Sequence, residues 1–327
     1  MFRKLVLLLI LLPLSLQAAK LNQGDYRFRS DVEDFISRVA ASTDYTEKEL
    51  VDLFSKVKHQ RDLFERMDRP AEKLAWHQYR RIFLTQKRID AGIKFWREHR
   101  ELIEQVEKKY QVPAEIIVAI VGVETFYGVY KGKSPVFDTL VTFAFDYPKR
   151  AEFFTRELEE FLVLSKENQL DTRAIMGSYA GAMGMPQFIA SSYRNYAVDG
   201  DGDGRANLFD SLPDILASVA NYFKRHGWVA GEAIAYPIRS GGKKLAKGVE
   251  PGMKPEHSWS RLKQAGFSSA LNLDDEQQLA LLKFEQADHN EYWAGLQNFY
   301  VITRYNHSPL YAMAVFQLSQ KLKEGVD

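Results

Sequence analysis

The sequence predicts a mainly α-helical protein with a small β-containing unit toward its C-terminal end. Between residues 32 and 57, apolar side chains recur at the spacing that places them on one face of a helix. Residues 116–127 are almost uniformly apolar, which indicates a helix buried on all sides. Residues 279–284 form a short apolar run that is typical of a strand.

Helices are expected over most of the first two thirds of the chain. A long amphipathic run covers residues 76–110, with a mild break at Gly92. The buried helix begins at Pro113, since proline fits a first helical turn, and Gly128 is its expected C-cap. Further amphipathic runs cover residues 150–164, 215–228 and 309–323.

The composition changes near Gly231. Residues 241–255 are rich in Gly, Lys and Pro, and residues 279–284 and 300–303 have the composition of strands. We therefore divide the chain into a leader, an N-terminal helical region, a core, a small strand-containing unit and a C-terminal segment. Their expected bounds are 1–19, 20–110, 111–230, 231–303 and 304–327.

The charge balance argues against a nucleic-acid partner. The chain of 327 residues carries 44 basic and 43 acidic side chains, a formal net charge of +1. Nucleic-acid binders usually carry a basic excess on one face. The chain has no cysteine, which excludes disulfides and a lipid anchor on a cysteine.

The first residues have the pattern of a secretory signal peptide. Arg3 and Lys4 precede an apolar run over residues 5–16, which small residues follow. This run is shorter than the roughly 20 residues of a membrane span, although an uncleaved anchor is the alternative interpretation. We expect an exported, periplasmic protein that is soluble or loosely associated with a membrane.

Glu124 is the strongest candidate for acid chemistry. It lies near the end of the apolar helix, where burial would raise the pKa of its carboxyl group. A carboxyl group that keeps its proton near neutral pH can act as a general acid in glycoside cleavage. The alternative is an ordinary glutamate that turns into solvent at a helix end.

An aspartate-rich loop predicts a calcium site. Oxygen ligands stand at positions one, three and five of the loop, a glycine at six and a backbone carbonyl at seven. Position twelve is Asp210, and Asp214 competes with it as the closing ligand. A turn without an ion is the alternative. The expected ligands are Asp199, Asp201, Asp203, the Arg205 carbonyl and one of these two carboxylates.

Aromatic and amide side chains are frequent in the expected loops and helix ends. Aromatic faces and amides suit the ring faces and hydroxyls of sugars, although each single aromatic could equally be a packing residue. The seven histidines lack metal-binding spacing, and no phosphate loop, dinucleotide motif or serine nucleophile elbow is present. Hydride and phosphoryl chemistry therefore have no support.

At these residues the sequence resembles the B-type lytic murein transglycosylases. The resemblance follows the chain in order through most of its length after the leader, and the series of motifs is far more specific than any single one. The motifs are GVETFYG (122–128), PKRAEFF (148–154), SYAGAMG (178–184), QF (187–188), SVANYF (218–223) and RYNHS (304–308).

The resemblance implies a lysozyme-like α+β catalytic core and Glu124 as its single catalytic residue. It also implies an EF-hand-like calcium site that serves structure, with a closing carboxylate beyond position twelve, hence Asp214. The glycan groove, to which the C-terminal segment returns, would be lined by Tyr79, Arg150, Ser178, Gln187, Phe188, Tyr305, Asn306 and Tyr311. In the QF motif, Pro186 stands before the pair and Ile189-Ala190 after it, where the family often has Met-Pro.

The implied reaction cleaves the β-1,4 bond between N-acetylmuramic acid and N-acetylglucosamine and closes a 1,6-anhydro ring, with no cofactor in the chemistry. The substrate's acetamido group would assist in place of a second carboxylate. The partners would be peptidoglycan glycan strands and proteins of cell-wall synthesis or remodelling. The alternatives are a muramidase that uses water, a non-catalytic glycan-binding scaffold and a calcium-responsive interaction protein.

Overall fold

The computed structural model describes residues 20–68, 71–242 and 248–327. The predicted signal peptide, residues 1–19, lies outside the described residues. The chain divides into two compact units, Met1–His59 and Gln60–Asp327, and the expected helical region 20–110 spans both. In the described part of the chain, no helix is both long and apolar enough to cross a membrane.

The first unit contains a pair of helices, α1 (Ser30–Ser42) and α2 (Glu47–Ser55). The Phe35 and Phe54 rings meet between them, with centroids 5.8 Å apart. Thr46 and Glu49 form a capping box at the start of α2, in which each side chain accepts the backbone N–H of the other residue. The helices predicted from the apolar spacing of residues 32–57 are confirmed.

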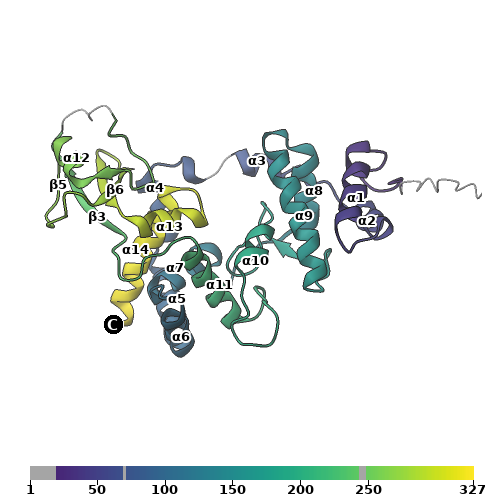
Figure 1. Ribbon diagram of the computed structural model, residues 1–327, viewed down its shortest axis with the longest axis horizontal. Coiled ribbons are helices and arrows are strands. Elements are labelled where there is room, and N and C mark those ends of the chain that lie inside the picture. The colour runs from purple at the N-terminus through teal and green to yellow at the C-terminus, as the bar shows by residue number, and fades with distance from the viewer. Residues whose placement is uncertain (1–19, 69–70, 243–247) are drawn as a thin grey trace, which may run out of the picture. The chain divides into compact units, whose positions relative to one another are not determined.

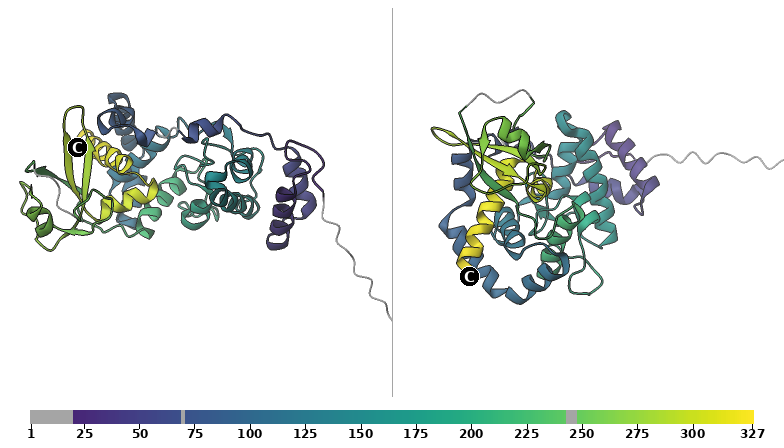
Figure 2. Two further views of the ribbon diagram at one scale, coloured as in Figure 1. Left: turned by 90° about the horizontal axis from the view of Figure 1, so that it is seen from above. Right: turned by 60° about the vertical axis from the view of Figure 1, so that its left-hand side comes forward.

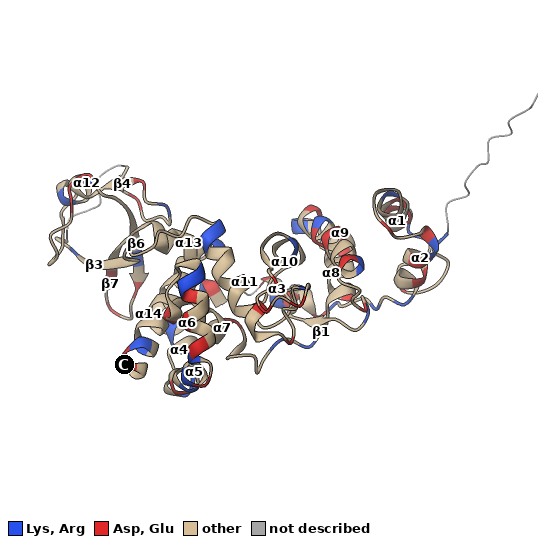
Figure 3. Cartoon of the chain, turned by 60° about the horizontal axis from the view of Figure 1, so that its bottom comes forward, with Lys and Arg blue, Asp and Glu red and all other residues tan. Residues whose placement is uncertain are grey.

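The second unit is built mainly from helices (Figure 1). Before the aspartate-rich loop they are α3 (Leu63–Asp68), η1 (Ala71–Lys73), α4 (Trp76–Phe83), α5 (Gln86–Glu98), α6 (Arg100–Tyr110), α7 (Ala114–Thr125), α8 (Val136–Asp146), η2 (Pro148–Arg150), α9 (Ala151–Glu167) and α10 (Ala190–Tyr196). After it they are α11 (Leu212–Arg225), α12 (Trp259–Gln264), α13 (Gln297–Tyr305) and α14 (Pro309–Val326). Basic and acidic residues are interleaved along these helices (Figure 3).

The apolar helix α7 lies at the centre of this unit. Every residue from Ile116 to Val121 is fully buried, because α5, α6, α11 and α14 all pack against the helix. The predicted burial is confirmed, but the expected C-cap at Gly128 is wrong. The helix ends at Thr125, since Phe126 and Tyr127 both adopt left-handed backbone conformations, with φ of 52° and 58°.

The run predicted over residues 76–110 is three helices rather than one helix with a break at Gly92. The first break comes at Thr85, whose hydroxyl accepts the Arg88 N–H and caps α5. Gly92 lies inside α5, where a Cβ would stand 2.1 Å from the hydroxyl oxygen of Tyr127. Glycine is therefore required here for close packing and does not end the helix.

The predicted strand-containing unit is a five-stranded antiparallel sheet with the order β4-β6-β7-β3-β5. Its strands are β3 (Ala235–Ser240), β4 (His257–Ser258), β5 (Phe267–Ser268), β6 (Gln278–Glu285) and β7 (Asn290–Gly295). Trp259, Leu262 and Leu281 belong to its own hydrophobic cluster. In both views of Figure 2 the C-terminal helices lie beside these strands. Two further strands, β1 (Ser134–Pro135) and β2 (Met176–Gly177), form a separate antiparallel pair. Along the chain β1 precedes α8, and β2 precedes α10.

The strand predicted at residues 300–303 is wrong, because these residues belong to α13. Aromatic and β-branched residues give this segment a high strand propensity. In the structure Phe299, Val301 and Ile302 are fully buried, and α13 packs against both α14 and β7. Tertiary packing outweighs the local preference, and the helix brings the following residues to the centre of the unit.

Candidate active site and metal loop

The end of α7 holds Glu124 in a fixed position. The Thr125 hydroxyl donates to the Met185 carbonyl at 3.0 Å and accepts the Gly128 N–H at 3.0 Å. Tyr127 inserts its ring beside Gly92 and Gly122, where side chains would collide with it. The last turn of α7 is thereby tied to the loop that follows β2 and to α5.

Glu124 bonds to one tyrosine and acts electrostatically on two others, and the three come from different helices. Tyr311 of α14 donates a hydrogen bond to Glu124 Oε1 at 2.6 Å. The Tyr305 ring lies nearly parallel to the Tyr311 ring, at an interplanar angle of 9°. Tyr79 of α4 is only 1% exposed, and burial first, then the charges of Glu72 and Glu124, raise the pKa of its hydroxyl group. The structure thus brings together four of the predicted site residues.

The surroundings of Glu124 favour its protonated form. The pKa of its carboxyl group is raised to about 7. Burial is the largest cause, the Tyr311 hydrogen bond opposes it, and the negative charge of Glu72 adds a smaller upward effect. The side chain keeps partial exposure, so a substrate can reach it. A carboxyl group in this state can donate a proton at neutral pH and take one back after it ionises.

Two further predicted residues, Phe188 and Asn306, are linked to groups of this centre. The Tyr305 hydroxyl donates to the Pro186 carbonyl at 2.7 Å, and the Phe188 ring packs 5.7 Å from the Tyr305 ring. Asn306 donates an amide N–H to Glu72 Oε1 at 3.4 Å. Phe188 is therefore packed against Tyr305, and Asn306 is bonded to Glu72.

Ser178 and Gln187 line a hollow of about 560 Å³ together with Tyr130 and Tyr179. The Gln187 amide donates to the Lys131 and Gly184 carbonyls, so its position is set by backbone contacts. Ser178 Oγ accepts the Ala182 N–H at 3.0 Å. Burial, and then the charge of Glu72, raise the pKa of the Tyr179 hydroxyl.

Arg150 is the predicted groove residue that the structure does not connect to this centre. It is exposed, and its guanidinium carbon lies 4.3 Å from the centre of the Phe153 ring. Among the described residues, no contact links it to Glu124. The nearby Lys149 and Tyr147 instead bond to Asp68, at 2.8 Å each.

The aspartate-rich loop gathers three carboxylates, and the donor set fits a hard cation. Ligand oxygens of Asp199, Asp201 and Asp203 lie within 4.8 Å of one another. Hydrogen bonds from backbone N–H groups, that of Gly204 first, lower the pKa of Asp199, so its carboxylate stays ionised. Arg205 follows at position seven of the loop.

The two competing closing carboxylates have different surroundings. Asp214 is fully buried, and its two oxygens accept the Gly200 and Asn207 N–H groups, each at 2.7 Å, so it joins the two sides of the loop. Asp210 is 82% exposed and lies 3.9 Å from Lys131. Neither belongs to the group of three carboxylates. The structure therefore gives Asp214 a role in holding the loop backbone, which the sequence did not predict.

The comparisons with known proteins agree with this geometry. Residues 27–320 match the transglycosylase SLT domain family. The chain is 40% identical to the membrane-bound lytic murein transglycosylase B of Escherichia coli K12 over 307 residues, which cover 91% of this chain and 84% of the relative. The chain belongs to the transglycosylase SLT family of lytic murein transglycosylases.

Solved structures of this family have the same fold. The soluble lytic transglycosylase SltB1 of Pseudomonas aeruginosa superposes with a TM-score of 0.84 at 44% identity, over 90% of this chain and 98% of that one. The Escherichia coli lytic transglycosylase Slt35 in complex with calcium superposes with a TM-score of 0.85 at 40% identity, over 93% and 96%. The predicted family and lysozyme-like, mainly helical fold class are thus confirmed.

One residue that acts on the candidate site is absent from the sequence-based prediction. Glu72 lies in the short helix η1 and affects the pKa of Glu124 and of Tyr79. It stands in a polar stretch, 52 positions before Glu124, and has no local pattern that marks a site. Only the tertiary structure brings it near the acid.

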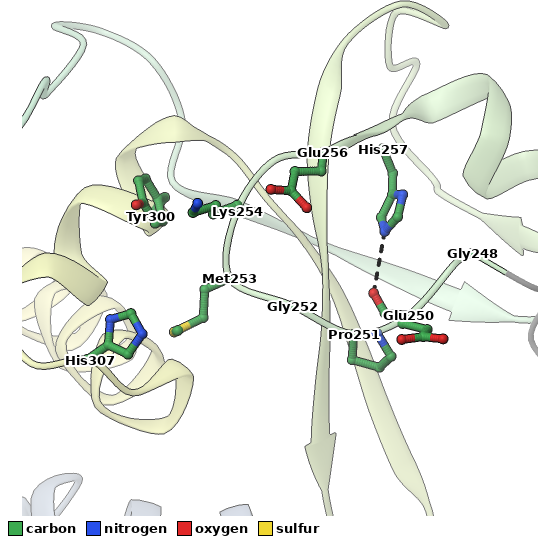
Figure 4. Close-up of a pocket in the computed structure, with 10 residues that line it drawn as sticks. All are labelled: Gly248, Glu250, Pro251, Gly252, Met253, Lys254, Glu256, His257, Tyr300 and His307. Atoms are coloured by element: carbon green, nitrogen blue, oxygen red, sulfur yellow. Dashed lines mark hydrogen bonds between the residues drawn. The ribbon is translucent and has the colours of Figure 1, made fainter.

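A second hollow, of about 530 Å³, lies between the loop at residues 248–257 and α13 (Figure 4). His257 Nε2 and the Glu250 carbonyl oxygen are 3.4 Å apart in it, and His307 and Tyr300 face it from the helical side. None of the predicted catalytic or glycan-binding residues lines this hollow. It is therefore distinct from the candidate site at Glu124.

Proposed function

We propose that Glu124 is the acid and base of the transglycosylase reaction in this chain. The observation that carries the proposal is a carboxyl group with a pKa of about 7, at the end of a buried helix and hydrogen-bonded to Tyr311. The substrate is the glycan strand of peptidoglycan, cut at the β-1,4 bond between N-acetylmuramic acid and N-acetylglucosamine.

In the first step, protonated Glu124 gives its proton to the bridging oxygen, and the bond from that oxygen to C1 of the muramic acid breaks. Positive charge develops at C1, and the neighbouring acetamido group can share it. The Tyr311 hydrogen bond stabilises the carboxylate that Glu124 becomes, as a donor does for an ionised acceptor.

In the second step, ionised Glu124 takes the proton of the 6-hydroxyl, whose oxygen bonds to C1 and closes the 1,6-anhydro ring. Glu124 returns to its protonated form, so the proton count balances over the cycle. The attacking hydroxyl belongs to the same sugar, which gives it a high effective concentration relative to water. Tyr79, Ser178, Gln187, Phe188, Tyr305, Asn306 and Tyr311 are the proposed contacts of the glycan, and Arg150 is proposed as a more distant one.

Mass spectrometry of the released muropeptides tests this proposal. A transglycosylase releases an anhydro product that is one water lighter than the hydrolysed product of a muramidase. Digestion of purified murein sacculi by this protein is expected to give anhydro ends only. Release of hydrolysed ends as the main product would overturn the proposed second step and support the muramidase alternative.

We also propose that the aspartate-rich loop binds calcium as a structural ion. Asp199, Asp201, Asp203 and the Arg205 carbonyl would hold it, with Asp214 as the carboxylate that fixes the loop around the ion. The support is the cluster of three carboxylates and the calcium in the Slt35 structure. When bound, the ion would neutralise the repulsion between these carboxylates and hold the loop ahead of α11.

The proposed place of action is the periplasm, with residues 1–19 as the export signal. The peptidoglycan strand is the proposed partner, and proteins of cell-wall synthesis or remodelling are proposed as further partners. The proposed division of the chain keeps residues 111–230 as the catalytic core, residues 231–303 as the strand-containing unit and residues 304–327 as the segment that returns to the glycan groove.

A further inference from the structure

The loop after α7 carries an exposed aromatic side chain shortly beyond the acid. Tyr130 is 65% exposed, and the preceding Val129 is exposed as well. The Tyr130 N–H donates to the Thr125 carbonyl at 2.8 Å, and the Tyr130 ring centroid lies 6.0 Å from that of Phe126. The turn that ends the helix of Glu124 thus holds a large aromatic ring in solvent.

Two more exposed apolar side chains, Met176 and Tyr179, come from β2 and the loop that follows it. Tyr130 and Tyr179 both line the hollow of about 560 Å³ that also contains Ser178 and Gln187, and we call it the tyrosine hollow. Met176 pairs with Pro135, another residue of its wall. Single exposed apolar residues are ordinary on a protein surface, whereas a group of them at one hollow is typical of a binding surface.

Backbone contacts fix the walls of the tyrosine hollow. Gly132 has a φ of 95°, and a Cβ there would lie 2.0 Å from the Gly177 carbonyl oxygen, so only glycine lets this loop approach β2 so closely. The Lys131 carbonyl accepts the Gln187 amide N–H at 3.2 Å. The hollow is therefore formed without a ligand, and its formation costs a ligand no binding free energy.

The tyrosine hollow adjoins the acid site without including it. Two proposed glycan contacts, Ser178 and Gln187, line it. The residue after Gln187 is Phe188, whose ring packs 5.7 Å from the Tyr305 ring. Within the described part of the chain, Glu124 is not among the lining residues. A glycan strand cut at Glu124 can therefore continue into the hollow with a sugar that takes no part in the reaction.

The chemistry of the lining suits a sugar ring. The C–H groups on one face of a sugar pack against an aromatic ring, and a hollow of this size is typical of ligand sites. Ser178 and Gln187 offer a hydroxyl and an amide oxygen for sugar hydroxyls. Asp62, Arg66 and Lys133 add further acceptors and donors. A strand carries a sugar at every position, whereas stem peptides branch only from the muramic acids, so a sugar is the occupant that every bound strand supplies.

We propose that the tyrosine hollow is a sugar subsite beyond the two sugars of the cleaved bond, with the Tyr130 ring as its platform. This inference rests on the proposed glycan-cleaving function. Tyr130 takes no part in proton transfer. It makes the protein prefer long glycan strands to short ones, because only a long strand fills the hollow while its cleaved bond lies at Glu124.

The test measures kcat and KM of Tyr130→Ala on peptide-free murein oligosaccharides of increasing length, from the disaccharide upward. We expect KM for long strands to rise roughly tenfold with kcat unchanged, the effect of losing one aromatic contact. The loss of kcat/KM is expected to grow with the number of sugars and to be absent for the shortest oligosaccharide. Because Tyr130 is exposed, the alanine variant is expected to fold and to melt as the unchanged protein does.

Two further variants separate the platform from other effects. Tyr130→Phe keeps the ring face and removes only the hydroxyl, so it is expected to keep the KM of the unchanged protein for long strands. Tyr300→Ala is the matched control, since it removes a tyrosine ring from the second hollow. It is expected to leave kcat and KM unchanged at every length.

A loss of kcat/KM in Tyr130→Ala that is equal at every length, or absent at every length, overturns the inference. A loss that appears only with strands that carry stem peptides also overturns it, because the hollow would then bind the peptide. Failure of the proposed function has a different signature, since Glu124→Gln would retain turnover. An inactive Glu124→Gln together with length-independent kinetics of Tyr130→Ala removes only the inference about the tyrosine hollow.

Discussion

Glu124 and Asp199 are both carboxyl groups, but their surroundings shift their pKa values in opposite directions. Burial at the end of α7 raises the pKa of Glu124 to about 7, whereas backbone N–H groups of its own loop lower the pKa of Asp199. The first group keeps a proton that it can donate, and the second keeps a charge that a cation can neutralise. The comparison teaches that the surroundings of a carboxyl group decide its protonation state: burial dominates at Glu124, and backbone hydrogen-bond donors dominate at Asp199.

The largest effect is expected from Glu124→Gln, which removes the proton and preserves the shape. Cleavage of murein should fall by roughly a hundredfold or more, the usual range for the loss of a general acid. The release of muropeptides by the purified variant measures this. Turnover close to that of the unchanged protein would show that another group acts as the acid.

The same substitution has an opposite effect on stability. The folded state holds the proton of Glu124 more tightly than the unfolded state, in which the pKa of the carboxyl group is about 4.5. Stability from this group is therefore present below pH 4.5 and is lost as pH rises toward about 7. We expect Glu124→Gln to melt at a temperature equal to or above that of the unchanged protein at pH 8, in thermal unfolding measured by circular dichroism.

A smaller effect is expected from Tyr311→Phe, which removes the hydrogen bond to Glu124 Oε1. That bond lowers the pKa of Glu124, so its loss should move the high-pH limb of activity to higher pH. We expect kcat to fall by about tenfold, in line with the loss of one hydrogen bond to a charged group. Tyr300→Phe, on the side of α13 that faces the second hollow, is the control with an unchanged profile. A limb that moves to lower pH would contradict the assigned direction.

The smallest effect on catalysis is expected at the aspartate-rich loop. Calcium at one hundred times its dissociation constant should stabilise the folded state by about 2.7 kcal/mol, with no change in the high-pH limb of activity. Asp201→Asn is expected to abolish the rise in melting temperature. Asp210→Asn should keep the rise, since Asp210 lies outside the group of three carboxylates. Identical melting curves with chelator and with excess calcium would remove the metal site.

Local patterns predicted those helices and strands in which the apolar residues of the sequence match the faces that are buried in the structure. The apolar run of α7, the spacing of α1 and the composition of β6 were sufficient, because burial on all sides, on one face or in a sheet leaves a distinct period. The strand prediction for residues 300–303 failed for the opposite reason. Its residues prefer strands locally, and only the packing of α13 against α14 and β7 makes a helix the lower free-energy choice.

The residues of the site also divide into those that the sequence predicts and those that only the structure reveals. The motif series marked Glu124 and the groove residues, and the aspartate spacing marked the loop. Glu72 could not be found, because it stands in a polar segment that is distant in sequence and meets Asn306 only after the chain folds back. The role of Asp214 was hidden for a related reason, since its contacts with Gly200 and Asn207 depend on the folded loop.

By itself, the sequence determined the family, the buried acid helix and the donor set of the loop, because apolar periodicity and motif spacing are properties of short segments. The tertiary structure alone decided which groups surround Glu124. Tyr79, Tyr305 and Tyr311 come from three helices, and Glu72 comes from a fourth segment. A pKa depends on the distances to such groups and on the water that they exclude, and both exist only in the folded chain.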